Sequence, residues 1–295
     1  MALWLADLYA AQYTGMDIEI WVEPFAGGLG AALTLLDRDH IGEAWFAEAN
    51  PAIAALWRTI IRDAQRLANH VADTTITLDT FWHARETVNT AFHTPHDTID
   101  PARDWDWALA ALTLNRCSRS GIVAPTVGPI GGKHQTGRYT LTDRFTPDAL
   151  AARIARIGDY AHRLRYYGAD GIACIEGLDG TVGIEEEMVL FVDPPYIQQG
   201  NRLYAAGMDA AGHARLADAL HACAAPWLVT YDDDPRVLSL YPTNPVLAVE
   251  MPHLANTRRI GHEYVVFGPG TLVPRVDHVT RGSSATWVRP LPAAS

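Results

Sequence analysis

The sequence predicts an α/β protein whose doubly wound sheet is interrupted by a mostly helical and loop insert. Three observations support this prediction: strand-like and helix-like segments alternate near the start, helices and loops fill the middle, and apolar strand-like runs return after residue 187. Such alternation is typical of a parallel sheet with helices on both faces. We expect a sheet domain at 1–75 and 165–270, an inserted domain at 76–164, and a loose tail at 271–295.

The first elements follow in the order strand, turn, helix, strand, helix. β-branched residues predict a strand at 18–23, and a glycine turn then opens an apolar helix at 31–36. A short strand is expected at 44–48. Asn50 is a favourable N-cap, and Pro51 suits the first position of the helix that follows.

The insert shows helix and loop patterns, and the second half of the chain shows strand patterns with one helix between them. Helices are predicted at 81–92, at 105–114 with Asp104 as N-cap, and at 147–164. Glycine, proline, threonine and basic residues at 122–142 indicate a loop or hairpin. Strands are then predicted at 188–192, 227–231, 246–249 and 264–267, with a helix at 211–223. We expect these strands to continue the parallel sheet.

The composition excludes several classes of protein. A chain with 48% hydrophobic and 19% charged residues is typical of a folded domain, which excludes a disordered or fibrous protein. The start lacks the basic residues of a signal peptide, and no apolar run is long enough to span a membrane. Three widely separated cysteines show no metal-binding spacing and fit a reducing compartment. We therefore expect a cytoplasmic protein with no membrane contact and no metal.

Basic residues concentrate in one part of an acidic chain. The formal net charge is −11, but residues 116–165 contain nine Lys or Arg against three Asp, so the remaining residues carry −17. A basic insert on an acidic body suits contact with nucleic acid, and a solvated surface can give the same skew. On charge alone, both interpretations stay open.

The first candidate motif is EPFAGGLGAA, at Glu23–Ala32. Glycines after a buried strand let the backbone approach a ligand closely, and the helix that follows presents free N–H groups to it. The same turn also occurs as a simple strand-to-helix connection. Glu48 follows the second predicted strand, where an acid can accept hydrogen bonds from ribose hydroxyls or simply start a helix.

The second candidate motif is DPPY, at Asp193–Tyr196, directly after an apolar strand. The Asp193 carboxylate and the Pro194 carbonyl can accept the two N–H bonds of an exocyclic amino group, and the prolines fix the backbone. Tyr196 can stack on the flat base that carries this amino group. The motif therefore predicts a site for an amino-bearing base, which we prefer over a purely structural diproline turn.

Together the two motifs resemble the Dam-like class of DNA adenine-N6 methyltransferases. The resemblance extends to GRY and RFTPDAL within 137–150, to LVTYDDDPRVLSLY at 228–241 and to RRIGHEYVVFGPG at 258–270, so that it covers residues 21–270. It implies a Rossmann-like methyltransferase sheet with an inserted target-recognition domain. It further implies methyl transfer from S-adenosylmethionine to an adenine that is flipped out of double-stranded DNA, with Asp193, Pro194, Pro195 and Tyr196 as the catalytic residues.

The resemblance also implies which residues bind the cofactor and the DNA. The candidate cofactor residues are Glu23, Pro24, Phe25, Gly27, Gly28, Gly30, Glu48, Asn50, Asp170 and Asp193. For Asp170, a role as a turn aspartate before a glycine is an equal alternative. The candidate DNA-binding residues, in the inserted domain, are Asn115, Arg116, Arg119, Lys133, Gln135, Arg138 and Tyr139.

Two features depart from the pattern of this class. Its members usually begin with a segment that holds a glycine pair and a lysine, and this chain starts just after the expected place of that segment. We expect this departure to affect cofactor affinity more than the fold. The PIGGK segment at 129–133 resembles the missing one, but its position makes it a DNA-facing loop. Leu29 stands in the turn where some relatives have glycine.

Two alternative functions stay open from the sequence. The same acceptor geometry suits methylation of cytosine N4 or of RNA amino groups, although motif order favours adenine in DNA. A relative that lacks the first cofactor segment could also be a non-catalytic DNA-binding protein. We expect a monomer, with a dimer on DNA as the alternative. The preference for arginine over lysine indicates a GC-rich bacterial or phage genome. A restriction-modification role of the protein is one possibility.

Overall fold

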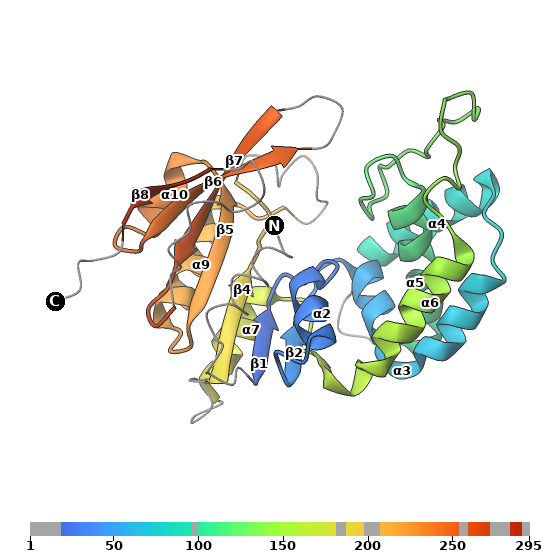
Figure 1. The fold of residues 1–295 in the computed structure, drawn as a ribbon. Helices are drawn as coiled ribbons and strands as arrows, with labels where there is room; N and C mark the ends of the chain where they lie inside the picture. Colours follow the sequence, from blue (N-terminus) through green and yellow to red (C-terminus); the bar gives the residue numbers. More distant parts are fainter. Residues whose placement is uncertain are drawn as a thin grey trace. The chain divides into compact units, whose positions relative to one another are not determined.

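The chain forms two compact units in the computed structural model, which describes residues 19–95, 100–180, 187–197, 207–253, 259–271 and 284–290 (Figure 1). Unit 1 comprises Met1–Phe46, Asp170–Arg202 and Ala206–Ser295, and unit 2 comprises Ala47–Ala169 and Leu203–Ala205. The chain therefore leaves unit 1 after its second strand, builds unit 2, and then returns.

Unit 1 contains a mixed sheet with the strand order β2-β1-β4-β5-β7-β6-β8. Its strands are β1 (Ile20–Glu23), β2 (Glu43–Phe46), β4 (Met188–Val192), β5 (Trp227–Asp232), β6 (Val246–His253), β7 (Arg259–Phe267) and β8 (Ala285–Arg289). β1 pairs in parallel with β2 and β4, and β4 pairs in parallel with β5. Every residue of β4 and β5 is buried, as expected of strands covered on both faces.

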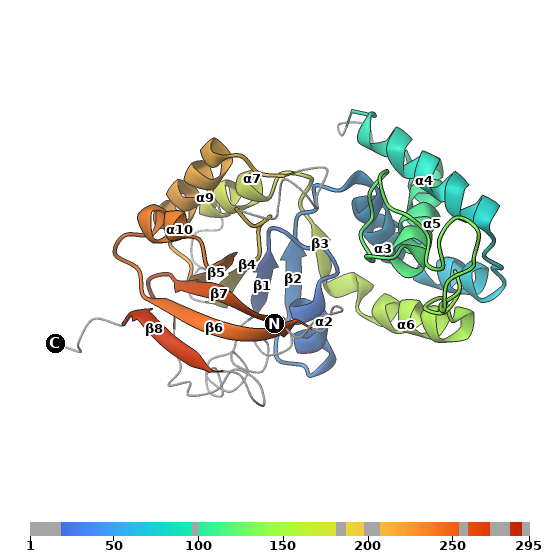
Figure 2. The same cartoon turned by 90° about the horizontal axis from the view of Figure 1, so that it is seen from above.

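Helices cover both faces of this sheet. Figure 2 shows α7 (Gly171–Glu176), α9 (Ala210–Ala222) and α10 (Pro235–Leu240) on one side of the strands and α2 (Gly30–Asp37) on the other. A short 3₁₀ helix, η2 (Gly177–Gly180), follows α7. The predicted doubly wound α/β class is confirmed by this arrangement.

Two expectations for the second half of the sheet are wrong. We expected the later strands to continue the parallel sheet, but β7 pairs antiparallel with β5, and β6 pairs antiparallel with β7 and β8. Hydrophobic periodicity carries no information on strand direction, which depends on pairing between distant segments. We also expected a loose tail after residue 270, but residues 285–289 form β8 beside β6.

Unit 2 is built mainly from four helices: α3 (Pro51–Ala72), α4 (Leu78–Phe92), α5 (Pro101–Cys117) and α6 (Pro147–Asp159). α3 packs on α5 and α6, and α4 packs on α5. For this reason α3 groups with the insert, whereas the sequence prediction assigned residues 51–75 to the sheet domain. The helix predicted at 147–164 ends at Asp159 and is followed by the 3₁₀ helix η1 (Ala161–Arg163) and by strand β3 (Leu164–Tyr166).

The two ends of unit 2 are joined by a backbone hydrogen bond. The N–H of Glu48 donates to the carbonyl of Gly168 over 3.0 Å, and Gly168 adopts a positive φ of 122° that glycine accepts at little cost. The beginning and the end of the segment Ala47–Ala169 are therefore neighbours.

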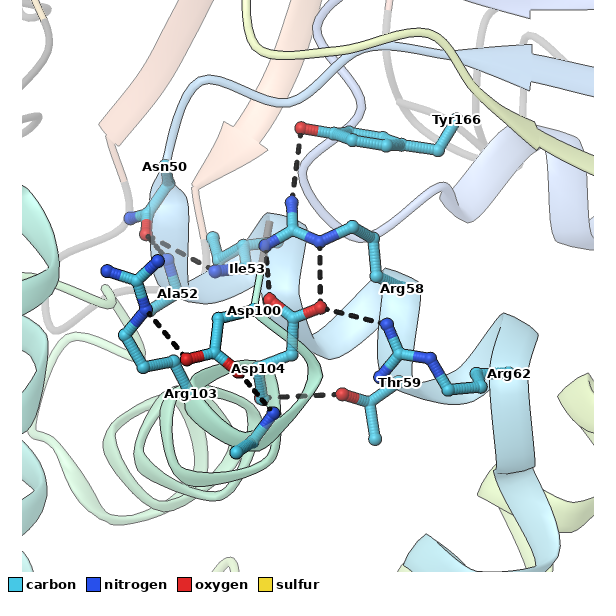
Figure 3. Close-up of polar contacts among 11 residues, drawn as sticks. Asn50, Ala52, Ile53, Arg58, Thr59, Arg62, Asp100, Arg103, Asp104 and Tyr166 are labelled. Carbon is cyan, nitrogen blue, oxygen red and sulfur yellow. Dashed lines mark hydrogen bonds and ion pairs between the residues drawn. The ribbon is translucent and has the colours of Figure 1, made fainter. Parts of the chain in front are cut away.

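A buried ion-pair network joins the helices of unit 2 (Figure 3). Asp104, only 1% exposed, accepts hydrogen bonds from Arg58 Nε at 3.1 Å and Nη2 at 2.5 Å. Arg62 Nη2 donates to the same carboxylate over 3.1 Å, and Arg58 Nη1 lies 3.4 Å from the Tyr166 hydroxyl. The network therefore ties α3 to α5 and to β3.

This network corrects the prediction that Asp104 caps α5. The helix begins one turn earlier, at Pro101, and the Asp100 carboxylate accepts from the N–H of Ala102 over 2.9 Å as its N-cap. Asp104 lies inside the first turn and faces the arginines of α3. The prediction for α3 is confirmed, because Asn50 is its N-cap and Pro51 its first residue.

Candidate functional site

The glycine turn between β1 and α2 is fixed by a buried glutamate. Glu23 Oε1 accepts hydrogen bonds from Trp21 Nε1 at 2.9 Å and from the N–H of Ala32 at 2.7 Å. The carboxyl group thus links the end of the strand to the first turn of the helix. Burial raises the pKa of Glu23 to about 7, although both hydrogen bonds oppose this shift.

The turn leaves open space beside its glycines. A Cβ added to Gly27 or to Gly28 would meet no protein atom within 4 Å, so a ligand can approach the backbone there. Gly27 has a φ of 49°, which disfavours any side chain, whereas the φ of Gly28 lies outside the left-handed region. These residues fit a cofactor that lies against the backbone of the turn.

Leu29 occupies the N-cap of α2 in a left-handed conformation, with φ 48° and ψ 39°. This conformation normally favours glycine. The Leu29 side chain is fully buried, and its burial offsets the backbone strain.

Asp170 caps helix α7 beside the glycine turn. Its Oδ1 accepts from the N–H groups of Ile172 at 2.9 Å and Ala173 at 3.1 Å, and Oδ2 lies 3.4 Å from Arg215 Nη1. These contacts fit the alternative interpretation from the sequence, in which Asp170 is a turn aspartate before a glycine. Gly171 packs so closely that a Cβ there would lie 2.2 Å from the carbonyl oxygen of Pro24. The start of α7 therefore rests directly on the EPF segment.

Glu48 and Asn50 follow β2 in the chain and belong to unit 2. Glu48 is buried, and its Oε1 accepts from the N–H of Asn50 over 2.6 Å. Asn50 Oδ1 accepts from the N–H groups of Ala52 and Ile53 at 3.1 and 3.3 Å, and its Nδ2 donates to the carbonyl of Val123 at 2.8 Å. Both side chains thus organise the start of α3, and their predicted contact with the cofactor stays a prediction.

Asp193 follows the last residue of β4 and is held by the neighbouring strand. Thr230, fully buried on β5, donates its hydroxyl proton to Asp193 Oδ1 over 2.6 Å. Two residues further along β5, Asp232 Oδ1 accepts from the N–H of Ile197 over 3.2 Å. β5 therefore fixes both ends of the DPPY segment.

Asp193 is exposed to solvent, although protein atoms surround its carboxyl group closely enough to desolvate it in part. This desolvation raises the pKa of its carboxyl, while hydrogen bonds from Thr230 and Tyr196 oppose the shift. An acceptor that is fixed by one neighbour and still accessible is what recognition of an amino group needs.

Glu263 is a site residue that the sequence interpretation missed. It lies on β7 in register with Asp232 of β5, and its Oε2 is buried without a hydrogen-bond partner among the described residues. Desolvation raises the pKa of Glu263 to about 7, and the negative charge of Asp193 adds to this shift. The residue is part of the RRIGHEYVVFGPG segment, but only the antiparallel pairing of β7 places it beside the DPPY motif.

The raised pKa of Glu263 predicts a dependence of stability on pH. A carboxyl with a pKa near 4.5 in the unfolded chain and about 7 in the folded chain binds more protons when folded, so unfolding becomes easier as pH rises through this window. We expect a slope of at most about 1.4 kcal/mol per pH unit for this group.

Denaturant titrations at a series of pH values test this prediction. Glu263→Gln should flatten the fall in unfolding free energy between about pH 5 and 7. Glu250→Gln is the control, because hydrogen bonds from Ser284 lower the pKa of this neighbouring carboxyl instead. An unchanged slope in the Glu263 variant would contradict the assignment.

A family model matches the sequence that builds the site just described. The model of the D12 class N6 adenine-specific DNA methyltransferases matches residues 13–251, which include the glycine turn, unit 2 and the DPPY segment. The chain belongs to this family. A comparison with curated protein sequences found no match.

Membership in the D12 class confirms the predicted activity at the level of the family. The protein is an adenine-N6 DNA methyltransferase, and its methyl donor is S-adenosylmethionine. Within the described residues, no helix is both long and apolar enough to cross a membrane. In that part of the chain, no group of three or more His, Cys, Asp or Glu residues is placed to hold a metal ion.

The predicted DNA-binding residues of this methyltransferase fall into two groups. Three of them have side chains engaged with the backbone of unit 2. Asn115 Nδ2 donates to the carbonyl of Gly121 at 3.0 Å, and Arg116 Nε donates to the carbonyl of Arg144 at 2.9 Å.

Of these three residues, Gln135 makes the most side-chain hydrogen bonds to the backbone. Its Nε2 donates to the carbonyls of Ile130 and Gly132 at 2.6 and 2.8 Å, and its Oε1 accepts from the N–H of Leu141 at 2.8 Å. The side chain therefore stabilises the conformation of the loop at residues 130–141. Gln135 can contact a base only if these hydrogen bonds are broken.

The other candidates are exposed: Arg119, Lys133, Arg138 and Tyr139. The guanidinium of Arg138 lies over the Tyr139 ring, 5.6 Å from its centroid, and this ring is 59% exposed. Arg119 and Lys133 line a pocket of unit 2 together with residues of α4.

Proposed function

We propose that this methyltransferase holds a flipped-out adenine of double-stranded DNA at Asp193, Pro194, Pro195 and Tyr196. The observation that carries the proposal is the Asp193 carboxyl, which is fixed by Thr230 at 2.6 Å and is accessible at the end of the buried strand β4. In this position the carboxylate and the Pro194 carbonyl accept the two N–H bonds of the adenine amino group, and Tyr196 stacks on the base.

Each residue then has a defined part in the reaction. S-adenosylmethionine, when bound, supplies an electrophilic methyl group. Asp193 orients the amino nitrogen and stabilises the positive charge that develops on it during direct transfer. Thr230 holds Asp193 in the orientation that this requires, and the base contacts offset the few kcal/mol that flipping costs.

The test is tritium transfer from labelled S-adenosylmethionine into unmethylated DNA, followed by nucleoside analysis. The proposal expects label in N6-methyladenine. Label in N4-methylcytosine or in RNA would contradict the assignment of the target base. DNA binding without transfer and without binding of the donor would favour a non-catalytic relative.

For the cofactor, we propose a site along Glu23, Pro24, Phe25, Gly27, Gly28 and Gly30, with further contacts from Glu48, Asn50, Asp170 and Asp193. The open space beside Gly27 and Gly28 supports this proposal. Residues 1–18, which precede the strand before the glycine turn, lie outside the described residues.

Replacing Gly28 by alanine tests this cofactor site. A methyl group there meets no protein atom, so the fold should keep its stability to within about 0.5 kcal/mol. If the cofactor lies against this backbone, the added methyl group should weaken S-adenosylmethionine binding by roughly tenfold or more. Isothermal titration measures this change.

Gly177→Ala is the matched control, because a Cβ at this position also meets no protein atom and its φ of −76° suits alanine. The control should bind S-adenosylmethionine as the wild type does. Equal affinity in both variants would place the cofactor away from the glycine turn.

For partners and origin, we propose a protein that acts as a monomer, or as a dimer on DNA, in the cytoplasm of a bacterium, and that is encoded by the bacterium or by a phage. The activity of the family and three cysteines without a disulfide support this setting. Light scattering with and without a DNA duplex distinguishes the monomer from the dimer.

A further inference from the structure

A basic pocket lies in unit 2 between α4 and the loops that follow α5. Its volume is about 280 Å³, and its lining includes Trp82, Arg85, Arg119, Gly128 and Lys133. None of the lining residues is acidic. The pocket is slightly smaller than the roughly 300–1,000 Å³ of typical small-molecule sites, so it suits a small anionic group of a larger ligand.

The three cations of the pocket are free to bind an anion. Among the described residues, neither Arg85, Arg119 nor Lys133 makes an ion pair or a side-chain hydrogen bond. Arg119 and Lys133 are exposed, and Lys133 is the only lysine in the sequence. Three like charges around one pocket repel one another, and a bound anion relieves this repulsion.

Trp82 serves to position Arg85. The Arg85 guanidinium lies 4.4 Å from the centroid of the Trp82 ring, and this ring makes a T-shaped contact with the Phe81 ring, whose centroid is 5.2 Å away. Arg85 therefore occupies one face of the Trp82 ring. The stacked guanidinium keeps its N–H donors for an anionic ligand.

The backbone of the pocket leaves room for such a ligand. A Cβ on Gly128 or on Gly132 would meet no protein atom within 4 Å, and Gly132 has a φ of 78°. Both glycines line the pocket. A phosphate with its adjoining sugars can therefore come close to this backbone.

We propose that this pocket holds a phosphate of the DNA backbone, bound by Arg85, Arg119 and Lys133, so that it anchors the duplex without reading its sequence. The inference rests on the proposed function, with DNA bound by the predicted DNA-binding residues of unit 2, and adds to them a site that includes Trp82 and Arg85 of α4. Phosphate contacts fix the register of a protein on DNA and carry no base information.

Fluorescence anisotropy with duplexes of unrelated sequence tests the site, at salt concentrations between about 50 and 200 mM. Arg85→Gln and Lys133→Gln should each weaken binding by about tenfold on every duplex, and each should reduce the steepness of the salt dependence by about 1. Arg66→Gln is the matched control, because Arg66 also stacks on a tryptophan, 4.2 Å from the Trp105 centroid, but does not line the pocket.

The outcomes separate this site from the function as a whole. If the wild type binds DNA and methylates it while both pocket variants keep its salt dependence, the phosphate site is refuted and the proposed function stands. A loss confined to one sequence would mean that the pocket reads bases, which also overturns the proposal. If the wild type binds no duplex, both proposals fail.

The single lysine allows a second test without any substitution. Acetylation of Lys133 by an activated ester, followed by mass spectrometry, should be slowed by bound duplex DNA and should itself weaken DNA binding. Equal modification rates with and without DNA would overturn the assignment of Lys133 to the phosphate. This test keeps the proposal falsifiable if loss of the Arg85 stacking on Trp82 prevents folding.

Discussion

The Asp193→Ala variant is expected to lose methyl transfer by about 10²–10⁴-fold, because the carboxylate that orients the amino group and stabilises its developing charge is removed. Binding of S-adenosylmethionine should largely persist, since the glycine turn remains intact. Tritium transfer into DNA measures the first quantity, and isothermal titration measures the second.

Asp233→Ala is the matched control for this experiment. Asp233 is an exposed aspartate that directly follows β5, so its removal tests whether any nearby negative charge suffices. The control should retain turnover. Normal turnover by the Asp193 variant would refute the proposed mechanism. Equal losses in both variants would mean that the total negative charge near the site matters, and not the position of the Asp193 carboxylate.

The second large effect is expected in unit 2, where Asp104→Ala should lower the free energy of unfolding by about 3–5 kcal/mol. The substitution leaves Arg58, whose side chain is only 15% exposed, without its ionic partner. Arg62, at 44% exposure, can turn to solvent and contributes less. Denaturant unfolding followed by tryptophan fluorescence measures the loss.

Two further variants show whether the ion pair itself causes this loss. Asp106→Ala removes an exposed carboxylate from the same helix and should change stability by less than about 0.5 kcal/mol. The double variant Arg58→Met/Asp104→Leu should recover much of the stability, because the uncompensated buried charge is gone. A double variant as unstable as Asp104→Ala would mean that packing around Asp104 matters more than its charge.

Much of unit 1 could be predicted from local sequence. β4 is a continuous apolar run, and β1 and β5 are rich in apolar and β-branched residues. In unit 2, α3 begins at an Asn-Pro pair, so each of these patterns has one dominant interpretation. The glycine turn and the DPPY segment could be found because their chemistry depends on residues that are adjacent in the chain.

The predictions from sequence were wrong where contacts between residues far apart in the chain determine the structure. β3 has only three residues, too few to show a period, and the direction of β7 follows from its pairing with β5. Because that pairing could not be predicted, Glu263 was missed. Asp104 precedes two tryptophans like a helix cap, and only the arginines of α3 explain its burial.

The hydrogen bond between Glu48 and Gly168 has a consequence for how such enzymes can diversify. A segment whose two ends meet can be exchanged for another without altering the strand before it or the helix after it. Residues 47–169 therefore form an exchangeable segment. A chimaera that carries a related segment between Phe46 and Asp170, with Glu48 and Asn50 retained, should keep its methyl-transfer chemistry while acquiring the sequence preference of the donor.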